Sequence, residues 1–269
     1  MKTTIRGLFL ATAGALGLAG PAAAATISVL GNDGAVYNVD VVTGIASFVT
    51  NIGDPPSTQP QFSPNALGVE AGSPTTITAM TFNTDGDESI IVNGTEENTF
   101  PTARDAAVAA GDSESGSYYY VDRDFGVYQV LANGAGDRNF LGDLGPDDTL
   151  GDLAIRGTTA YLSYGSSFSS FDLTDVDDGF EQTASASRFV GLGFAGDTLY
   201  GVSATSQLYM WNGTFDPDPF SYVADITLDG STPLRGLTDA SSAVPLPAAG
   251  WLLLGALGGL AAMRRRKTA

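Results

Sequence analysis

A hairpin-like pattern repeats along this chain of 269 residues and constrains its fold more than any other feature. Each copy joins an apolar segment, a polar turn with Gly, Asn, Asp or Ser, and a second segment in which aromatic residues alternate. Such a pattern around a short turn is typical of a β-hairpin. The copies are Thr26–Asp40, Tyr118–Val130, Ala160–Asp172 and Thr198–Asn212.

Further apolar segments flank these hairpins and complete a larger repeating unit. They precede the hairpin at Leu150–Ile155, Phe189–Phe194 and Leu234–Thr238, and follow it at Ile45–Ile52, Arg138–Leu144 and Phe220–Leu228. A weaker copy is expected at Ile77–Phe82 and Ser89–Asn93. Strand, hairpin and strand with a period of about 40–45 residues form the blade of a β-propeller, so the sequence predicts an all-β propeller of about five blades.

The two ends of the repeating region complement each other. Leu234–Ala240 has the features of a first strand with no hairpin after it, and Thr26 begins a hairpin with no first strand before it. Pairing of these segments would complete one blade, close the ring and remove exposed sheet edges. The alternative architecture is a β-sandwich, which needs no such period. Between the blades, Gly53–Gly72 is expected to be a proline-rich loop and Thr102–Ala110 a short helix.

The composition excludes several kinds of chemistry. The chain has no His and no Cys, which excludes a Ser-His-Asp triad, thiol nucleophiles, iron–sulfur clusters and ordinary zinc sites. Its two lysines lie outside residues 26–243, so Schiff bases are excluded in that region. The same region holds six arginines and all 30 acidic residues, a formal charge of −24. Nucleic acid and anionic lipid surfaces are therefore not expected as partners.

Carboxylate chemistry survives these exclusions. Clustered acids could supply oxygen ligands for calcium, although none fits the twelve-residue calcium loop and acids in turns more often form Asx turns. A glycosidase would need two carboxylates at a set separation, and with 30 acids the sequence nominates no pair. We therefore expect no catalytic residue and no cofactor other than calcium. The calcium candidates are Asp85, Asp87, Glu88, Asp175, Asp177 and Asp178.

Gly191–Gly196 has the glycine spacing of a dinucleotide-binding loop. That motif requires a helix after the glycines, whereas Asp197–Val202 has the features of a strand. We interpret these glycines as part of a strand and the turn after it.

The N-terminus has the three regions of a secretory signal peptide. Lys2 and Arg6 give a positive start, Gly7–Gly20 is apolar, and small residues follow up to Ala25. Signal peptidase is expected to cleave after Ala24 or Ala25. Residues 1–25 are thus a predicted signal peptide, and the domain 26–243 is predicted to be exported.

The C-terminus, residues 244–269, combines a proline motif, an apolar run and a basic cluster. As a helix, the 16 residues Ala248–Met263 would be about 24 Å long, shorter than the hydrocarbon core of about 30 Å. Trp251 near one end suits the membrane interface, and cations at the other end favour the cytoplasmic side. A weak anchor of this kind suits a segment that is later removed. The cations are Arg264, Arg265, Arg266 and Lys267.

This tail resembles the C-terminal sorting signal of bacterial exported proteins that exosortases recognise, the PEP-CTERM family. The resemblance rests on the order of the three features and on a motif of the Val-Pro-Leu-Pro-Ala variant. Leu246 stands where the standard motif of the wider family has Glu. It implies transient anchoring in the inner membrane, cleavage by an exosortase-type enzyme, and a final place at the cell surface or outside the cell; the alternative is a permanent tail anchor. The motif residues are Val244, Pro245, Leu246, Pro247 and Ala248.

The repeat pattern is also loosely similar to uncharacterised bacterial propeller domains. Together these features predict an exported binding or structural module of the cell surface or extracellular matrix, with extracellular polysaccharide as a candidate partner. The alternative is a carboxylate-dependent hydrolase of extracellular polysaccharide. A third interpretation is that the propeller displays an acidic surface that keeps a matrix hydrated.

Overall fold

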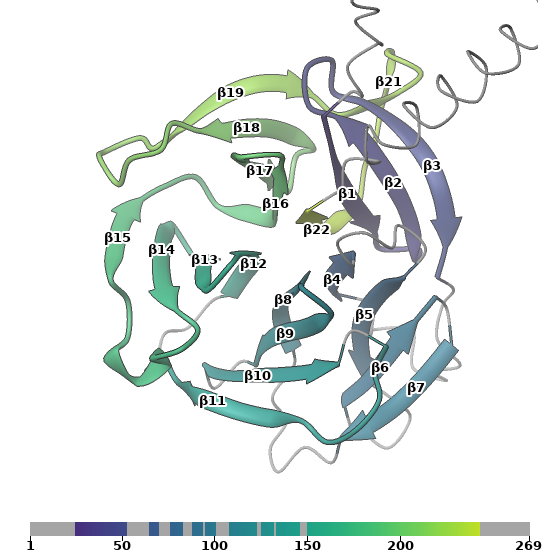
Figure 1. Ribbon diagram of the computed structural model, residues 1–269. Helices are drawn as coiled ribbons and strands as arrows, with labels where there is room; N and C mark the ends of the chain where they lie inside the picture. Colours follow the sequence, from purple (N-terminus) through teal and green to yellow (C-terminus); the bar gives the residue numbers. More distant parts are fainter. Residues whose placement is uncertain are drawn as a thin grey trace, which may run out of the picture.

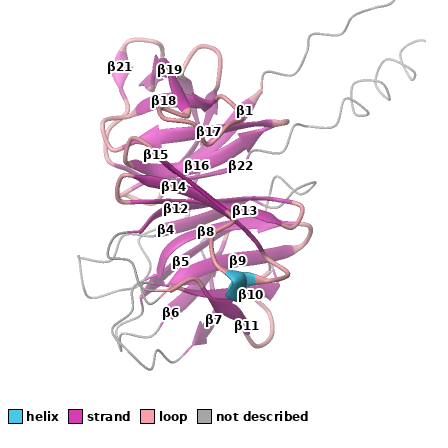
Figure 2. Ribbon diagram, turned by 90° about the vertical axis from the view of Figure 1, so that its left-hand side faces the viewer, coloured by secondary structure: helices cyan, strands magenta, loops and turns pink. Residues whose placement is uncertain are grey.

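The computed structural model describes residues 25–52, 65–69, 76–82, 88–93, 95–100, 108–122, 125–131, 133–145 and 150–242. Within these residues the regular structure is β-strand, apart from one turn of 3-10 helix, η1 (Val176–Asp178). The strands form five small sheets, antiparallel apart from one short strand pair, arranged around a central axis as the blades of a β-propeller (Figure 1). The side view shows η1 in cyan among the strands (Figure 2).

Four blades contain four strands each, in chain order from the axis outward. Blade 2 has β4 (Asn65–Val69), β5 (Ile77–Phe82), β6 (Glu88–Val92) and β7 (Thr95–Phe100). Blade 3 has β8 (Val108–Glu114), β9 (Ser117–Asp122), β10 (Gly126–Leu131) and β11 (Asn139–Asp143). Blade 4 has β12 (Leu150–Arg156), β13 (Thr159–Tyr164), β14 (Ser167–Asp172) and β15 (Gln182–Ser185). Blade 5 has β16 (Phe189–Ala195), β17 (Thr198–Ser203), β18 (Gln207–Trp211) and β19 (Phe220–Asp225).

Blade 1 is built from both ends of the described chain. Its inner strand β22 pairs antiparallel with β1, with Val29 opposite Ala240, and β2 and β3 continue outward. Beyond β3, the short strand β20 runs parallel to it and pairs with β21. The strands are β22 (Leu237–Ser242), β1 (Thr26–Gly31), β2 (Ala35–Asp40), β3 (Ile45–Asn51), β20 (Thr227–Leu228) and β21 (Thr232–Pro233).

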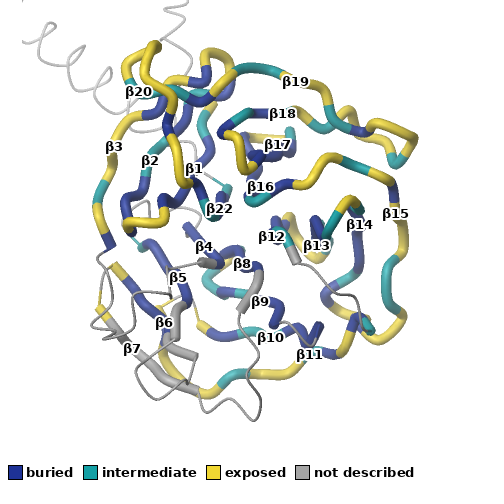
Figure 3. The backbone as a smooth tube through the Cα atoms, turned by 180° about the vertical axis from the view of Figure 1, so that it is seen from behind, coloured by how far each residue is buried: buried dark blue, intermediate teal, exposed yellow. Residues whose placement is uncertain are grey.

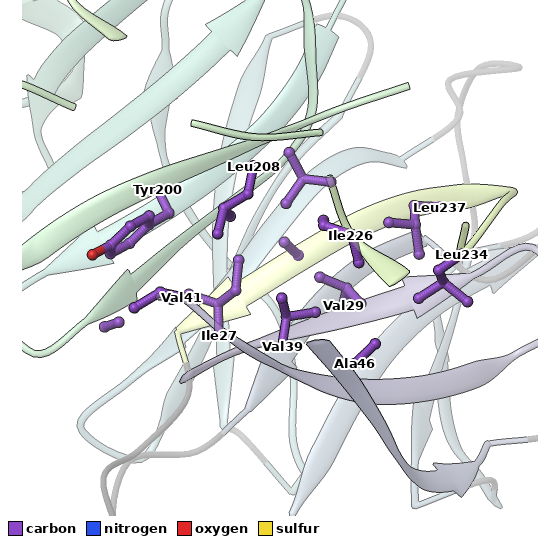
Figure 4. Close-up of a cluster of buried hydrophobic side chains, with 13 residues drawn as sticks. Ile27, Val29, Val39, Val41, Ala46, Tyr200, Leu208, Ile226, Leu234 and Leu237 are labelled. Atoms are coloured by element: carbon purple, nitrogen blue, oxygen red, sulfur yellow. The ribbon is translucent and has the colours of Figure 1, made fainter. Parts of the chain in front are cut away.

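The segment between blade 5 and β22 connects the outer parts of blades 5 and 1. Ile226 donates its N–H to the carbonyl of Ser206 in blade 5 at 2.7 Å, and Thr227 donates to the carbonyl of Gly44 in blade 1 at 3.0 Å. The side chain of Ile226 is fully buried. It packs in a cluster with side chains of both blades, including Val39 and Leu208 (Figure 4).

Buried residues concentrate in the strands nearest the axis, and exposed residues follow the outer strands (Figure 3). The apolar clusters fill the spaces between neighbouring blades, because alternate side chains of each strand face opposite sides of the blade. In blade 1, for example, Val29 packs toward blade 5 and Leu30 toward blade 2. Each blade is therefore stabilised mainly by its two neighbours.

The repeat analysis predicted the blade number and most strands. The structure confirms an all-β arrangement of five blades, with the hairpins at the four predicted places. Two predictions were wrong. The expected loop Gly53–Gly72 contains the inner strand β4, and the expected helix Thr102–Ala110 ends in strand residues, since Val108 begins β8. Alanine favours helix locally, but Ala110 pairs with Val121 of β9, so tertiary pairing overrides that preference.

Candidate functional site

Three aspartates occupy the inner strands around the axis of the propeller. Asp112 lies on β8, Asp152 on β12 and Asp239 on β22, and each has no exposed surface. We call these three side chains the axial carboxyl cluster. Acidic residues are rarely buried to this extent without compensating contacts, so their partners indicate their role.

Each carboxyl group binds the main chain of its own strand and of a neighbouring blade. Asp239 accepts the N–H of Ala240 at 2.6 Å with one oxygen and that of Leu67 in blade 2 at 2.8 Å with the other. Asp152 likewise accepts the N–H of Leu153 at 2.7 Å and that of Leu192 in blade 5 at 2.5 Å. These bonds satisfy inner-strand amides that have no strand partner on the axial side.

Asp112 follows the same arrangement and adds serine contacts. It accepts the N–H of Ser113 at 2.9 Å and that of Ile155 in blade 4 at 2.8 Å. The hydroxyl of Ser241 on β22 donates to Asp112 at 2.6 Å and accepts the N–H of Val69 at 3.0 Å. The cluster and its serines thus connect inner strands of different blades by hydrogen bonds.

The glycines of Gly191–Gly196 explain how blade 5 approaches this network. A Cβ atom on Gly193 would lie 2.6 Å from the carbonyl oxygen of Ser241, and one on Gly191 would lie 2.7 Å from the main-chain nitrogen of Ala240. Gly196 has φ +60° in the turn between β16 and β17. The interpretation of these glycines as strand and turn is therefore confirmed, with a close approach of two strands as the physical reason.

Burial sets the protonation of the cluster. Desolvation raises the pKa of Asp112 to about 7 and that of Asp239 to about 8. Burial, followed by the nearby charge of Asp239, raises the pKa of Asp152 well above its usual range. The two carboxyls titrate as a coupled pair. Because the pKa of both groups is raised, the pair is protonated at neutral pH.

Tyr118 of β9 completes the polar environment. Its hydroxyl donates to the carbonyl of Ala66 in blade 2, and burial together with the charges of the cluster raises its pKa well above the usual range. The hydroxyl therefore remains a neutral donor at any pH at which the protein is studied.

A protonated carboxyl pair is chemically able to transfer a proton, but this pair has no exposed surface for a substrate to reach. Its oxygen atoms are also occupied by main-chain amides. Within the part of the chain that the structure describes, no three acidic side chains form a group suited to a metal ion. The geometry favours a role in holding the blades together.

The six calcium candidates do not form one site in the described residues. Asp85 and Asp87 lie outside those residues, and Glu88 is the first residue of β6. Asp175 precedes η1, which contains Asp177 and Asp178 and has exposed acids at its surface. The carboxylate of Asp177 accepts the N–H of Asp143 at 3.2 Å and so connects blades 4 and 3.

The predicted sorting motif Val244–Ala248, Trp251 and the basic cluster lie outside the described residues, as do residues 1–24. In the ranges that the structure does describe, no helix has the length and apolar character required to cross a membrane.

The sequence analysis did not nominate the axial carboxyl cluster. A signal for it exists, because Asp152 and Asp239 each interrupt an otherwise uncharged inner strand, Leu150–Ile155 and Leu237–Ser242. In a strand buried on both sides, an acidic residue requires specific partners. Asp112 had no such signal, since the start of its strand was predicted to be the end of the helix Thr102–Ala110.

No protein-family model and no curated protein matches this chain. Among solved structures, it is similar to one described as a nidogen/laminin complex, with a TM-score of 0.50 and 14% identity over 81% of this chain and 85% of that chain. The computationally designed proteins Ika4 and Ika8 match with TM-scores of 0.41 and 0.40 and identities of 14% and 11%, covering 58% and 73% of this chain and 94% and 57% of theirs. The first similarity supports the propeller fold.

Proposed function

We propose that this chain is an exported β-propeller that acts as a binding or structural module at the cell surface or in the extracellular matrix. The observation that carries this proposal is the enclosure of the axial carboxyl cluster. Its three acids have strongly raised pKa values, yet all are fully buried and bound to the main chain. We interpret the three acids as groups that hold the blades together and not as a binding site. Contact with a partner is then expected at the exposed turns and outer strands.

The proposal includes two processing steps, cleavage by signal peptidase and cleavage by an exosortase-type enzyme after transient anchoring in the inner membrane. The described strands are compatible with both. They begin at Thr26 and end at Ser242, so removal of residues 1–25 and 244–269 would leave every one of them intact. The pairing of β1 with β22 supports the further proposal that the two ends of the processed domain close the ring.

Intact mass of the protein from cells and from culture medium tests the proposed processing. Loss of the first 24 or 25 residues, together with loss of the residues from about Val244 onward, is the expected result. A membrane fraction in which the chain continues to Ala269 would make it a permanently anchored protein and would overturn the proposed place in the matrix.

Binding and hydrolysis are separated by a panel of extracellular polysaccharides, scored for retention of the protein and for release of reducing ends. Retention without release is expected for a binding module. Release that disappears on substitution of one acidic pair would instead establish the carboxylate-dependent hydrolase.

Calcium is tested independently by calorimetric titration of chelator-treated protein. A stoichiometric binding heat would add calcium to the proposal, and no heat would remove it.

A further inference from the structure

The last described strand, β22, makes polar contacts with the inner strand of every other blade. Asp239 binds β4 through Leu67, and Ser241 binds β8 through Asp112. Ser242 accepts the N–H of Phe194 in β16 at 2.9 Å, and Ala240 donates its N–H to Asp152 of β12 at 3.4 Å. Within its own sheet β22 pairs only with β1. Its side chains therefore connect the ring across the axis rather than along one blade.

We propose that the axial carboxyl cluster is a proton-dependent switch that holds β22 in the ring while it is protonated and releases this strand when its protons are lost. The inference goes beyond the proposed function and does not depend on it.

The contact between Asp152 and Asp239 is the sensitive point. While both carboxyls are protonated, the pair carries no charge; loss of the proton of Asp239, with a pKa of about 8, places an uncompensated charge on β22 inside the buried cluster. Asp112 differs because the hydroxyl of Ser241 donates to it at 2.6 Å, a contact that an ionised carboxylate strengthens. Loss of protons therefore strains β22 at Asp239 first.

Within the described residues, no cation pairs with the cluster. Glu114 on β8 acts on Asp112, the three carboxyls act on the phenol group of Tyr118 on β9, and the guanidinium of Arg138 donates to the hydroxyl of Tyr120 at 3.2 Å. The neighbouring inner strands β4 and β16, and β1 beside β22, contain no titratable side chain. Arg156 lies at the end of β12, where it is exposed and paired with Asp197.

β22 is also the inner strand that can leave the ring most readily. It pairs with β1, which is distant in sequence, whereas each other inner strand pairs with the strand that follows it, so its departure breaks the β1 pairing and the axial contacts without disturbing another hairpin. Local opening of such a unit at a lower free energy than global unfolding is a common property of proteins.

The direction of the pH dependence follows from the raised pKa values. Between the unfolded value of 3.8 and the folded values of about 7 for Asp112 and about 8 for Asp239, the folded state binds protons that the unfolded state has released. The stabilisation is complete below about pH 4 and is lost as the pH rises to about 8. For each proton that only the folded state holds, a rise of one pH unit in that window lowers the folding equilibrium constant by up to about tenfold.

The first test measures the free energy of unfolding and the hydrogen exchange of the full chain between pH 5 and 9, with exchange corrected for its intrinsic pH dependence. The folding constant is expected to fall with rising pH, and peptides covering Leu237–Ser242 are expected to lose at least about tenfold protection before β12 and β16 do. A folding constant that is flat over this range, or simultaneous loss of protection in all the inner strands, would overturn the proposal. Repetition in about 1 M NaCl, where surface repulsion is screened, should leave the effect in place.

The second test uses Asp152→Asn, which retains the shape of the side chain and a donor toward Asp239 but cannot ionise. The pH slope is expected to decrease by about one proton relative to the wild-type chain. Asp229→Asn is the matched control: this exposed carboxyl has a lowered pKa and is therefore ionised in the folded and unfolded chain throughout this range, so the variant should keep the wild-type slope. An unchanged slope in a folded Asp152→Asn protein contradicts the proposal, and if this variant does not fold, the wild-type measurements decide.

Discussion

Aspartate has opposite roles at the axis of the propeller and in the turns at its outside, which we call the rim. At the axis, Asp152 and Asp239 accept main-chain N–H groups, and burial raises their pKa. On the rim, Asp172 accepts the N–H and the hydroxyl of Thr174, and Asp229 accepts similar bonds from the turn that follows it. These bonds lower the pKa of both exposed carboxyls. Since the carboxyls at the axis and on the rim accept hydrogen bonds of the same kind, burial is what reverses the direction of the pKa shift.

The two regions therefore respond to pH with opposite signs. A rim carboxyl of lowered pKa stabilises the fold above its unfolded value and loses this effect as the pH falls through its folded value. The axial carboxyls stabilise the fold at low pH and lose their effect as the pH rises to about 8. We expect the stability maximum near pH 4, where both contributions are present. Substitutions that compare axis with rim test this difference.

The largest effect is expected for Asp239→Ala. The substitution leaves the N–H of Leu67 without its acceptor, leaves that of Ala240 with only the longer contact of 3.4 Å to Asp152, and removes the carboxyl coupled to Asp152. Chemical denaturation at pH 5 should show a loss of about 3 kcal/mol or more. The rim counterpart Asp229→Asn, which keeps a residue that tolerates the φ of 51° at this position, should lose far less, and equal losses in the two variants would remove the distinction between axis and rim.

A somewhat smaller loss is expected for Gly193→Ala. The added methyl group would overlap the main chain of Ser241, and because β16 and β22 are both fixed by neighbouring blades, the strain is expected to cost about 1–3 kcal/mol in denaturant unfolding. Gly196→Asn is the control in the adjacent turn. No atom lies within 4 Å of its Cβ position and its φ is +60°, a conformation that Asn tolerates. Tolerance of Gly193→Ala would contradict the close approach of these two strands.

Ser242→Ala tests one serine at the axis, whose hydroxyl also donates a longer contact of 3.4 Å to Asp112. It leaves the N–H of Phe194 without its acceptor at 2.9 Å, and the expected loss is about 1 kcal/mol because the site is only partly buried. Ser231→Ala, in an exposed turn, removes a contact of similar geometry to Asp229. Its unfolding midpoint should stay at the wild-type value, whereas a larger loss on the rim than at the axis would reverse the comparison.

The smallest effect is expected on the outer strand of blade 1. Phe48 is 62% exposed and makes an edge contact with Tyr37, its cross-strand partner. Phe48→Ser should change the free energy of unfolding by no more than about 0.5 kcal/mol, the range typical of surface substitutions. A loss above about 1 kcal/mol, measured by the same denaturation assay, would show that the outer strands contribute to the core.

The fold was predictable from the sequence where a strand repeats a recognisable pattern. The hairpins at Thr26–Asp40 and Thr198–Asn212 were located because aromatic residues alternate around polar turns, and β1–β2 and β17–β18 occupy them. β4 was missed because it lies in a proline-rich segment and is only five residues long. β8 was missed because its alanines favour helix locally, and only its pairing with β9 makes it a strand.

The axial carboxyl cluster was harder to predict than the blades. Asp112, Asp152 and Asp239 are distant in sequence and belong to three blades, so their proximity depends on how the blades are arranged around the axis. One sequence with 30 acidic residues does not show which of them are buried. An uncharged strand interrupted by one Asp, as in Leu150–Ile155, was the only local signal, and it identifies a buried position without its partners.

Carbon-13 NMR of the protein labelled at aspartate carboxyl carbons measures the central difference between axis and rim most directly. The signal of Asp152 should remain that of a protonated acid at pH 6, and those of Asp112 and Asp239 should titrate near 7 and 8. The signals of Asp172 and Asp229 should be those of carboxylates at every pH above about 4. Aspartate signals that all titrate below pH 5 would show that the axial carboxyls are ionised in the folded protein and would contradict the account.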